Sequence, residues 1–259
     1  MLLAFTTGLI ILVLGIVAGG YGTIVGAGGG FIFVPALLII LNMDPVVAAS
    51  SGLFIVLINA LSGVTGYAIK RKINYKIGLL TASGAIPGSL IGVWILQRFS
   101  SQVFYLIFAT ILTLLGIYLF FKNVLPCSDK YVQNQPGKRE SFPSIKWLPL
   151  FGVFLGVLSS YMGIGGGWLL VPVLIYVFRL SPHQSAATSI FSLAIYTSIG
   201  VAAQLFYNNI DWLTVLWGGA GVILGSQIGV ILSQKLPGKL IVQMLSFLLI
   251  IIGVRLYFQ

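Results

Sequence analysis

The chain has 259 residues, of which 58% are apolar and 7% charged, with a mean hydropathy of +1.08 and a formal charge of +10. Too few polar side chains are present to cover a soluble globular domain, so the composition excludes that class. The basic residues lie in short stretches between apolar segments, as cytoplasmic loops of membrane proteins do, and do not interleave with aromatic residues as nucleic-acid sites do. We therefore expect membrane lipid, and no nucleic acid, around this chain.

The first half of the chain contains five apolar segments, which we expect to be helices. Long apolar runs with interspersed Gly and Pro are typical of membrane helices, whereas barrel strands alternate over about ten residues. The segments are expected at residues 2–25, 30–42, 45–69, 77–97 and 101–121. The second segment is too short to cross the membrane, because about twelve helical residues extend only about 18 Å. It is either a discontinuous half-helix or one arm of a re-entrant hairpin.

A polar stretch, residues 122–147, separates this half from a second half that repeats it. The same five segments are expected at residues 148–162, 167–178, 182–206, 213–234 and 238–257. A shift of 137 positions aligns the halves without a gap, and helix-breaking residues match: Gly28 and Pro35 align with Gly165 and Pro172. The expected organisation is a membrane repeat over residues 1–121, a cytoplasmic linker over 122–147 and a second membrane repeat over 148–259.

The distribution of basic residues predicts the orientation of the chain. With the linker in the cytoplasm, twelve of the 14 Lys and Arg residues lie inside, and only Arg98 and Arg255 lie outside. The basic loop at residues 70–76 aligns with the uncharged-to-acidic loop at 208–212, so equivalent loops lie on opposite faces. We predict an all-α, polytopic protein of the inner (cytoplasmic) membrane, built from two inverted five-segment repeats with both termini outside.

The candidate binding site centres on two glycine clusters at equivalent positions. GAGGGFIFVPAL begins at Gly26, and GIGGGWLLVPVL begins at Gly163. Such glycines are expected to interrupt a helix and expose the N-terminus of the next short helix, whose N–H groups and partial positive charge suit an anion. The alternative is that they only permit close helix packing. Because the cluster occurs twice in register, we favour binding. The candidate residues are Gly28, Gly29, Gly30, Gly165, Gly166 and Gly167.

Hydroxyl side chains follow each short segment and are the second group of candidates. Ser50 and Ser51 lie early in the third segment, and Thr188 and Ser189 lie at the matching place in the second half. Their hydroxyls are able to donate hydrogen bonds to an oxyanion, although Ser and Thr in helices commonly bond to carbonyls of their own helix. An anion in a low-dielectric site needs such donors, because no Asp, Glu, Lys or Arg lies well inside any segment.

The sequence does not indicate an enzyme. One His, one Cys and four acidic residues provide no catalytic residue and no set of metal ligands. The glycine clusters lack the Lys-Ser/Thr of a P-loop and the βαβ context of a dinucleotide site, so no cofactor is expected. The expected partner is a small anionic substrate, and the sequence leaves the oligomeric state open.

The stretch from GIGGGWLLVPVL to Ser189 resembles the TauE/SafE sulfite exporter family of bacterial membrane transporters. The resemblance covers essentially the whole chain. It rests on the glycine cluster, on Pro172, which lies seven residues after the first of the paired glycines, and on the Ala-Thr-Ser of residues 187–189. The first half departs from the pattern with Ala27 and with Ala-Ser-Ser at 49–51, which leaves open an unequal contribution of the two halves. The resemblance implies export of sulfite, sulfoacetate or another organosulfur anion.

Export of an anion also agrees with the membrane potential. An inside-negative potential of about 100 mV contributes about 2.3 kcal/mol per charge to export, so no coupling ion is required. An anion uptake permease or a channel for a related oxyanion is the alternative, because these classes share broken helices and a polar site near the membrane midplane.

Overall fold

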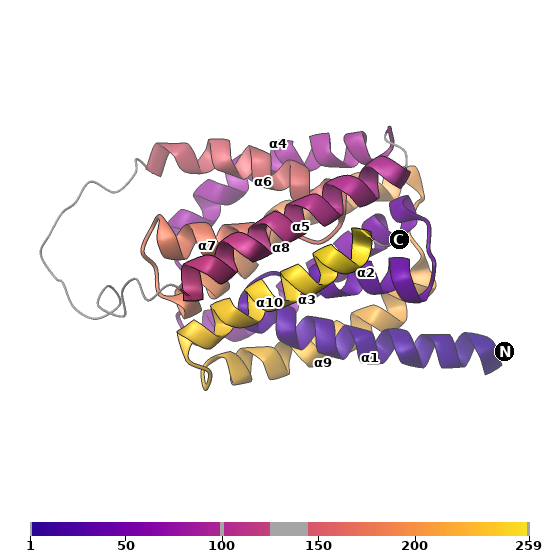
Figure 1. Ribbon diagram of the computed structural model, residues 1–259, viewed down its shortest axis with the longest axis horizontal. Coiled ribbons are helices and arrows are strands. Elements are labelled where there is room, and N and C mark those ends of the chain that lie inside the picture. The colour runs from indigo at the N-terminus through magenta and orange to yellow at the C-terminus, as the bar shows by residue number, and fades with distance from the viewer. Residues whose placement is uncertain (1, 99–100, 125–144, 258–259) are drawn as a thin grey trace, which may run out of the picture.

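A computed structural model describes residues 2–98, 101–124 and 145–257, and all regular structure in them is helical. The helices pack side by side in one bundle (Figure 1). The first half forms α1 (Leu2–Val25), α2 (Gly30–Ile40), α3 (Pro45–Ile69), α4 (Tyr75–Leu96) and α5 (Ser101–Val124). After a 3-10 turn (Ile145–Trp147), the second half forms α6 (Leu148–Met162), α7 (Gly167–Tyr176), α8 (Pro182–Tyr207), α9 (Trp212–Ser233) and α10 (Gly238–Tyr257). The predicted all-α fold is confirmed, and the centre of the linker lies outside the described residues.

Four long helices begin at a polar capping residue, which explains where they start. Asp44 accepts hydrogen bonds from the N–H groups of the first turn of α3, and Ser181 does the same for α8. Asn74 and Asp211 cap α4 and α9 in the same way. Capping side chains satisfy N–H groups that have no partner within the helix. Since these four residues form two pairs related by 137 positions, the duplication extends to the helix starts.

Each half begins with a hairpin of two helices, whose re-entrant position in the membrane stays a prediction. Gly8 of α1 packs on Trp217 near the beginning of α9. The helix α3 begins at the same end of the molecule, because Ser51 contacts Asp211 at the start of α9. The short α2, which leads into α3, therefore runs back toward the end from which α1 came. Figure 1 shows α6 and α7 returning in the same way at the linker end. Of the two arrangements left open by the sequence, the hairpin is the one formed.

The two halves exchange helices rather than packing as separate bundles. The first helix of each half lies along the fourth helix of the other, in the pairs α1 with α9 and α4 with α6. Among the remaining long-helix pairs, α3 with α8 and α5 with α10 join equivalent helices, and α4 with α8 matches α3 with α9. Glycines allow this close approach: Gly88 faces the carbonyl oxygen of Val153, and Gly225 faces that of Ile16, the two equivalent positions.

The contacts and helix directions agree with the predicted relation of the halves. Under the 137-residue offset each of these packing pairs maps onto itself or onto another of them. In Figure 1, α1 starts at one end of the molecule, and α6, its counterpart, starts at the linker end opposite. This agrees with inverted repeats, and the inverted relation in the membrane stays a prediction.

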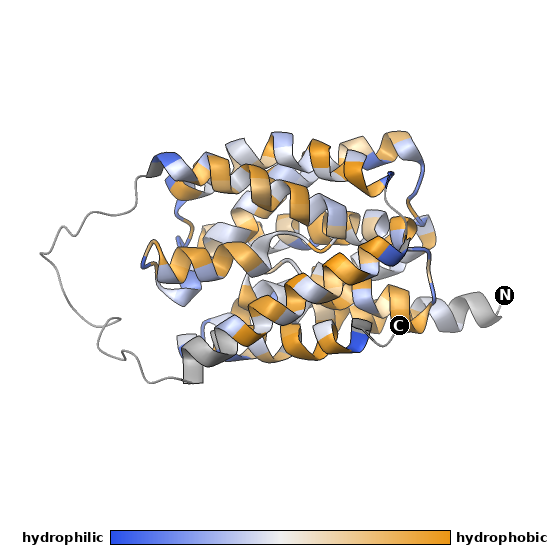
Figure 2. Ribbon diagram, turned by 45° about the horizontal axis from the view of Figure 1, so that its top comes forward, coloured by the Kyte–Doolittle hydropathy of each residue, from blue (hydrophilic) through white to orange (hydrophobic). Residues whose placement is uncertain are grey.

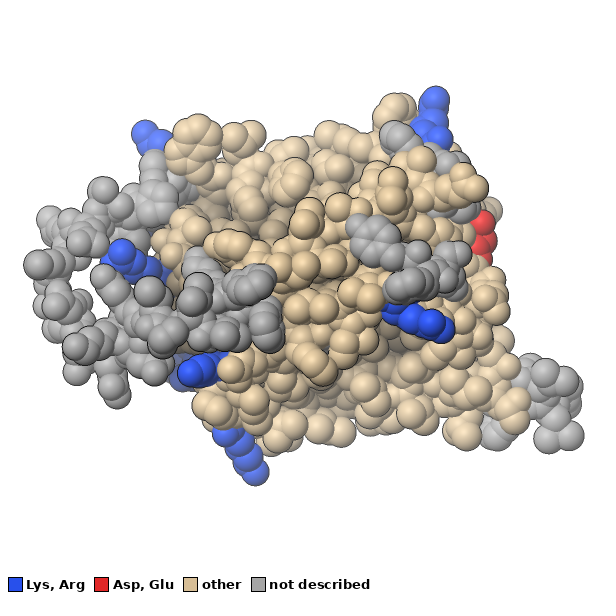
Figure 3. Space-filling view, in the orientation of Figure 1, with Lys and Arg blue, Asp and Glu red and all other residues tan. Residues whose placement is uncertain are grey.

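The outer surface of the bundle is suited to lipid. Six helices in the described part of the chain are long and apolar enough to cross a membrane: α1, α3, α4, α8, α9 and α10. Apolar residues run along the helices and polar residues gather near their ends (Figure 2). On the face drawn in Figure 3, Lys and Arg side chains lie toward the two ends of the molecule. The chain is therefore a multi-pass membrane protein.

The contact between α1 and α9 provides a stability test. In Gly225→Ala the new methyl group collides with the backbone carbonyl of Ile16, so α1 and α9 must separate. We expect a loss of about 1–3 kcal/mol in unfolding free energy, as for other overpacked cores. Gly219→Ala on the same helix is the control, because its methyl group meets only the flexible end of Ile58. Unfolding in detergent measures both, and equal stability would contradict close packing at Gly225.

Candidate functional site

The two glycine loops, residues 26–29 and 163–166, meet at one place inside the bundle. A methyl group on Gly28 would lie 3.0 Å from Val56 and 3.1 Å from Leu193. One on Gly165 would lie 2.9 Å and 3.0 Å from the same two side chains. Val56 and Leu193 are themselves related by the 137-residue offset. The clusters that the sequence places far apart therefore face a common point, which the repeat relation predicts.

The loops are in direct backbone contact, which explains their glycines. A side chain on Gly30 would lie 2.7 Å from the Cα atom of Ile164, and one on Gly167 would lie 2.8 Å from that of Ala27. Gly28 has a φ of +85°, in the left-handed region that glycine adopts without strain. Both conformation and lack of space exclude larger residues here.

The N-terminus of α2 has backbone donors that the protein does not use. The N–H groups of Ile32 and Phe33 bond to the carbonyl of Gly29, at 3.1 Å each. Those of Gly30 and Phe31 have no hydrogen-bond partner among the described residues. Gly29 caps the helix without a side-chain hydrogen bond. Two N–H groups thus point out of an uncapped helix end, an arrangement that suits an anion.

The equivalent end of α7 has the same two N–H groups, those of Gly167 and Trp168, without a hydrogen-bond partner among the described residues, and it differs from α2 at the residue before them. The N–H of Gly166 donates to the Tyr196 hydroxyl at 2.8 Å, and Tyr196 is fully buried. The residue at the matching position in the first half is Asn59. Its Oδ1 accepts a bond of 3.2 Å from Thr23, and its buried Nδ2 has no partner among the described residues. Both short helices therefore offer two N–H groups without a partner in the described chain, and the halves differ in the polar side chain beside them, a tyrosine in the second half and an asparagine in the first.

The four predicted hydroxyls are buried, and their hydrogen bonds divide them into two groups. Ser189 donates to the carbonyl of Gly26 at 2.8 Å and so belongs to the glycine loops. Ser50 donates to Val46 of its own helix at 2.7 Å. Both protons are thus engaged with carbonyls. This is the bonding that helical Ser and Thr commonly make.

Ser51 and Thr188 act as acceptors at equivalent places. Ser51 accepts a bond of 2.9 Å from the N–H of Asp211, and Thr188 accepts one of 3.0 Å from the N–H of Asn74. These bonds tie α3 and α8 to the starts of α9 and α4. Each hydroxyl keeps its own proton, which is available for donation.

The structure thus brings together most, but not all, of the residues predicted for the site. Gly28–Gly30, Gly165–Gly167 and Ser189 lie at the meeting point of the loops. Ser50, Ser51 and Thr188 bond to other elements. Binding of an anion by these residues stays a prediction.

Sequence analysis missed Tyr196, and the repeat offers the signal that would have found it. The 137-residue offset places Tyr196 on Asn59, so both halves carry a polar group at the same position of an apolar segment. Asn59 and Gln227 make hydrogen bonds between helices, to Thr23 and Ser62. Among residues 2–98, 101–124 and 145–257, no three His, Cys, Asp or Glu side chains group as metal ligands would.

Comparison with known proteins identifies membrane transporters as relatives. Residues 11–256 match the family described as Sulfite exporter TauE/SafE. The chain is 28% identical to the probable membrane transporter protein YunE of Bacillus subtilis, over 96% of this chain and 97% of YunE. It is 24% identical to a probable membrane transporter protein of Methanocaldococcus jannaschii, over 94% and 93%, and 25% identical to YjnA of B. subtilis, over 92% and 94%. No solved structure matches the chain.

The bond between Gly166 and Tyr196 can be tested by removing one hydroxyl. Tyr196→Phe leaves the buried N–H of Gly166 without its acceptor, so the unfolding free energy should fall by about 1–3 kcal/mol. Tyr75→Phe is the control, because Tyr75 is 49% exposed and contacts Phe191 through its ring. Unfolding of both variants in detergent is the measurement. A Tyr196→Phe protein as stable as the control would show that the hydroxyl does not cap α7.

Proposed function

Because this chain belongs to the TauE/SafE sulfite exporter family, we propose that it exports a small sulfur-containing anion, either sulfite or an organosulfonate such as sulfoacetate. The family and the names of the relatives make it a membrane transporter. The substrate class, the direction and the location in the cytoplasmic membrane are the proposed part.

The observation that carries the proposal is the meeting of the two glycine loops inside the bundle. Two short helices, α2 and α7, begin there, and both loops pack against Val56 and Leu193. Broken helices whose N-termini face a central point are how many transporters hold an anionic group. The repeat relation supports a single site shared by both halves over two separate sites.

The anion is held by the N-termini of both short helices in this proposal, those of α7 through Gly167 and Trp168, and Asn59 of the first half adds a further donor. The N–H groups of Gly30 and Phe31 have no protein partner among the described residues, and the dipole of α2 adds a partial positive charge. Asn59 lies three residues after Val56, so both are on the face of α3 toward the loops. Its Nδ2 is a further buried donor without a partner in the described chain. Neutral donors of this kind suit one singly charged oxyanion group, such as a sulfonate, since no buried cation compensates a larger charge at one point.

The hydroxyls contribute to different degrees. Thr188 and Ser51 keep protons that are not donated to a carbonyl, so they are ready donors. Ser189 and Ser50 would have to exchange a carbonyl for the anion. We rank Thr188 first, because it belongs to the half whose Ala-Thr-Ser matches the family pattern.

In the proposed orientation, the membrane potential favours export of an anion. Both termini lie outside, and the linker lies in the cytoplasm with most of the basic residues. The two hairpins then enter the bundle from opposite faces, as inverted repeats, and small movements of one repeat against the other expose the meeting point to either side. The membrane potential drives the anion outward.

Flux into liposomes tests the function. Purified protein in liposomes is given sulfite, sulfoacetate, sulfate or thiosulfate, with a potassium salt of an impermeant anion as the cation control, under an imposed potential. We expect flux of at least one sulfur oxyanion. This flux should move net charge across the membrane and follow the imposed potential. Flux of the cation alone would overturn the proposal. Movement of anions at rates that do not saturate with concentration would favour a channel instead.

Removal of single hydroxyls tests the site. Thr188→Val should weaken substrate binding by about 1–3 kcal/mol, the effect of losing a donor to a charged group. Thr197→Val is the control on the same helix, because Thr197 is equally buried and donates to Leu193 of its own helix at 2.6 Å. Ser189→Ala and the Ser50/Ser51 double replacement by Ala complete the series. Affinity within twofold of the wild type in all three, with folded protein, would exclude the hydroxyls from the site.

A further inference from the structure

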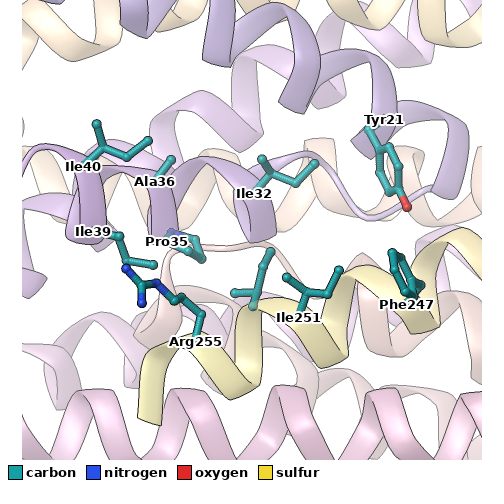
Figure 4. A pocket seen from close by; sticks show the side chains of 10 residues that line it. Tyr21, Ile32, Pro35, Ala36, Ile39, Ile40, Phe247, Ile251 and Arg255 are labelled. Atoms are coloured by element: carbon teal, nitrogen blue, oxygen red, sulfur yellow. The ribbon is translucent and has the colours of Figure 1, made fainter. Parts of the chain in front are cut away.

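A groove opens on the side of the bundle between α2 and α10 (Figure 4). Its volume is about 500 Å³, in the range of small-molecule sites. The walls are α2 from Ile32 to Ile40 and α10 from Phe247 to Arg255, and Tyr21 of α1 lies between them. We call it the lateral groove. Its place outside the glycine loops separates it from the transport site.

The lateral groove has aromatic side chains at one end and a charged side chain at the other. In Figure 4, Tyr21 and Phe247 lie at one end, and Arg255 lies beside Ile39 at the other. The Tyr21 hydroxyl donates to the carbonyl of Met244 at 2.6 Å, which joins α1 to α10 behind the groove. Among the described residues that line the groove, Arg255 is the only charged one. The groove is thus apolar along its length and has a cation at one end.

The surroundings of the lateral groove are lipid. Ile40 is 53% exposed, Ile251 51% and Phe247 63%, all on helices of a membrane protein. Arg255 lies in the last turn of α10, after an apolar run, and basic residues at helix ends are expected at the level of the lipid headgroups. Arg255 forms no ion pair with a carboxylate in the described part of the chain. An exposed guanidinium at this level suits a phosphate oxyanion.

We propose that the lateral groove binds one anionic phospholipid. An acyl chain lies along α2 and α10, and the lipid phosphate contacts Arg255. The short α2 explains why the groove exists: eleven helical residues extend about 16 Å, about half the hydrocarbon thickness, so the hairpin leaves a recess that a chain fills. The apolar walls and the cation match the two parts of such a lipid.

The second half differs at the two positions that form the charged end. The residue that aligns with Arg255 is Tyr118 of α5, and the one that aligns with Ile39 is Tyr176 of α7. The proposal therefore concerns the groove beside α10 alone. A second copy of the chain fits the lateral groove less well, because a symmetric contact repeats the same patch on both subunits and places two Arg255 cations at one interface.

Native mass spectrometry of the full chain tests the proposal. Protein in mild detergent is incubated with equal amounts of phosphatidylglycerol and phosphatidylcholine, and the retained lipids are counted. We expect one phosphatidylglycerol to be held in preference to phosphatidylcholine. Arg255→Gln should reduce this preference about fivefold, the factor for one basic residue at an anionic lipid surface. Arg98→Gln should not, because Arg98 stacks on Trp94 at 4.9 Å outside the groove.

Two variants fill the lateral groove from opposite walls. Ala36→Phe acts from α2 and Ile251→Trp from α10, and each should abolish retention of the lipid without lowering the melting temperature of the protein. Two variants are used so that the test remains valid if one of them fails to fold. Equal retention of the two lipids by the wild type, or an unchanged preference in Arg255→Gln, would overturn the proposal. So would a wild-type dimer that carries no lipid and becomes monomeric in either filled variant, since the groove would then be a subunit interface.

Discussion

A backbone that stops being helical inside a membrane exposes N–H and C=O groups that lipid cannot satisfy. In this protein each half has such a break, and the two breaks are placed against each other. The carbonyl of Gly26 receives the Ser189 hydroxyl, and the N–H of Gly166 is received by Tyr196. The remaining architecture depends on this arrangement: glycines let the backbones touch, and α3 and α8 cross behind them to supply Val56 and Leu193. The N–H groups that have no partner among the described residues, those of Gly30 and Phe31 and of Gly167 and Trp168, are the ones that an anion would use.

The short helices link the interior to the lipid-facing surface. Because α2 returns after eleven residues, its N-terminus reaches the centre of the bundle while its sides leave a recess beside α10. The same feature thus creates an electropositive helix end inside and an apolar groove outside. The long helices then hold the hairpins in place through contacts between the halves, above all where Gly225 meets Ile16 and Gly88 meets Val153.

The sequence predicted the helices well, because Gly, Pro and capping residues mark their ends directly: α2 was expected to begin at residue 30 and does so. The hairpin could not be chosen over a spanning pair, since that depends on contacts such as Gly8 with Trp217, far apart in the chain. Hydroxyl directions were also beyond the sequence. Ser50 and Ser51 are neighbours, yet one bonds to its own helix and the other to α9, because the rotation of α3 decides which way each points. Tyr196 in an apolar helix looks like an ordinary core aromatic until its partner, thirty residues away, is known.

The exchange of helices between halves has a consequence for biosynthesis. The glycine-lined face of α1 is completed only by α9, which begins 187 residues after α1 ends at Val25. At about 5–20 residues per second, the ribosome needs on the order of 10–40 s to make that stretch. During this time α1 lies in the bilayer without its partner, and α4 similarly waits for α6. The newly made first half therefore has helix faces without their partners, and these faces must be kept apart from other proteins. The linker keeps the second half close enough to pack against them.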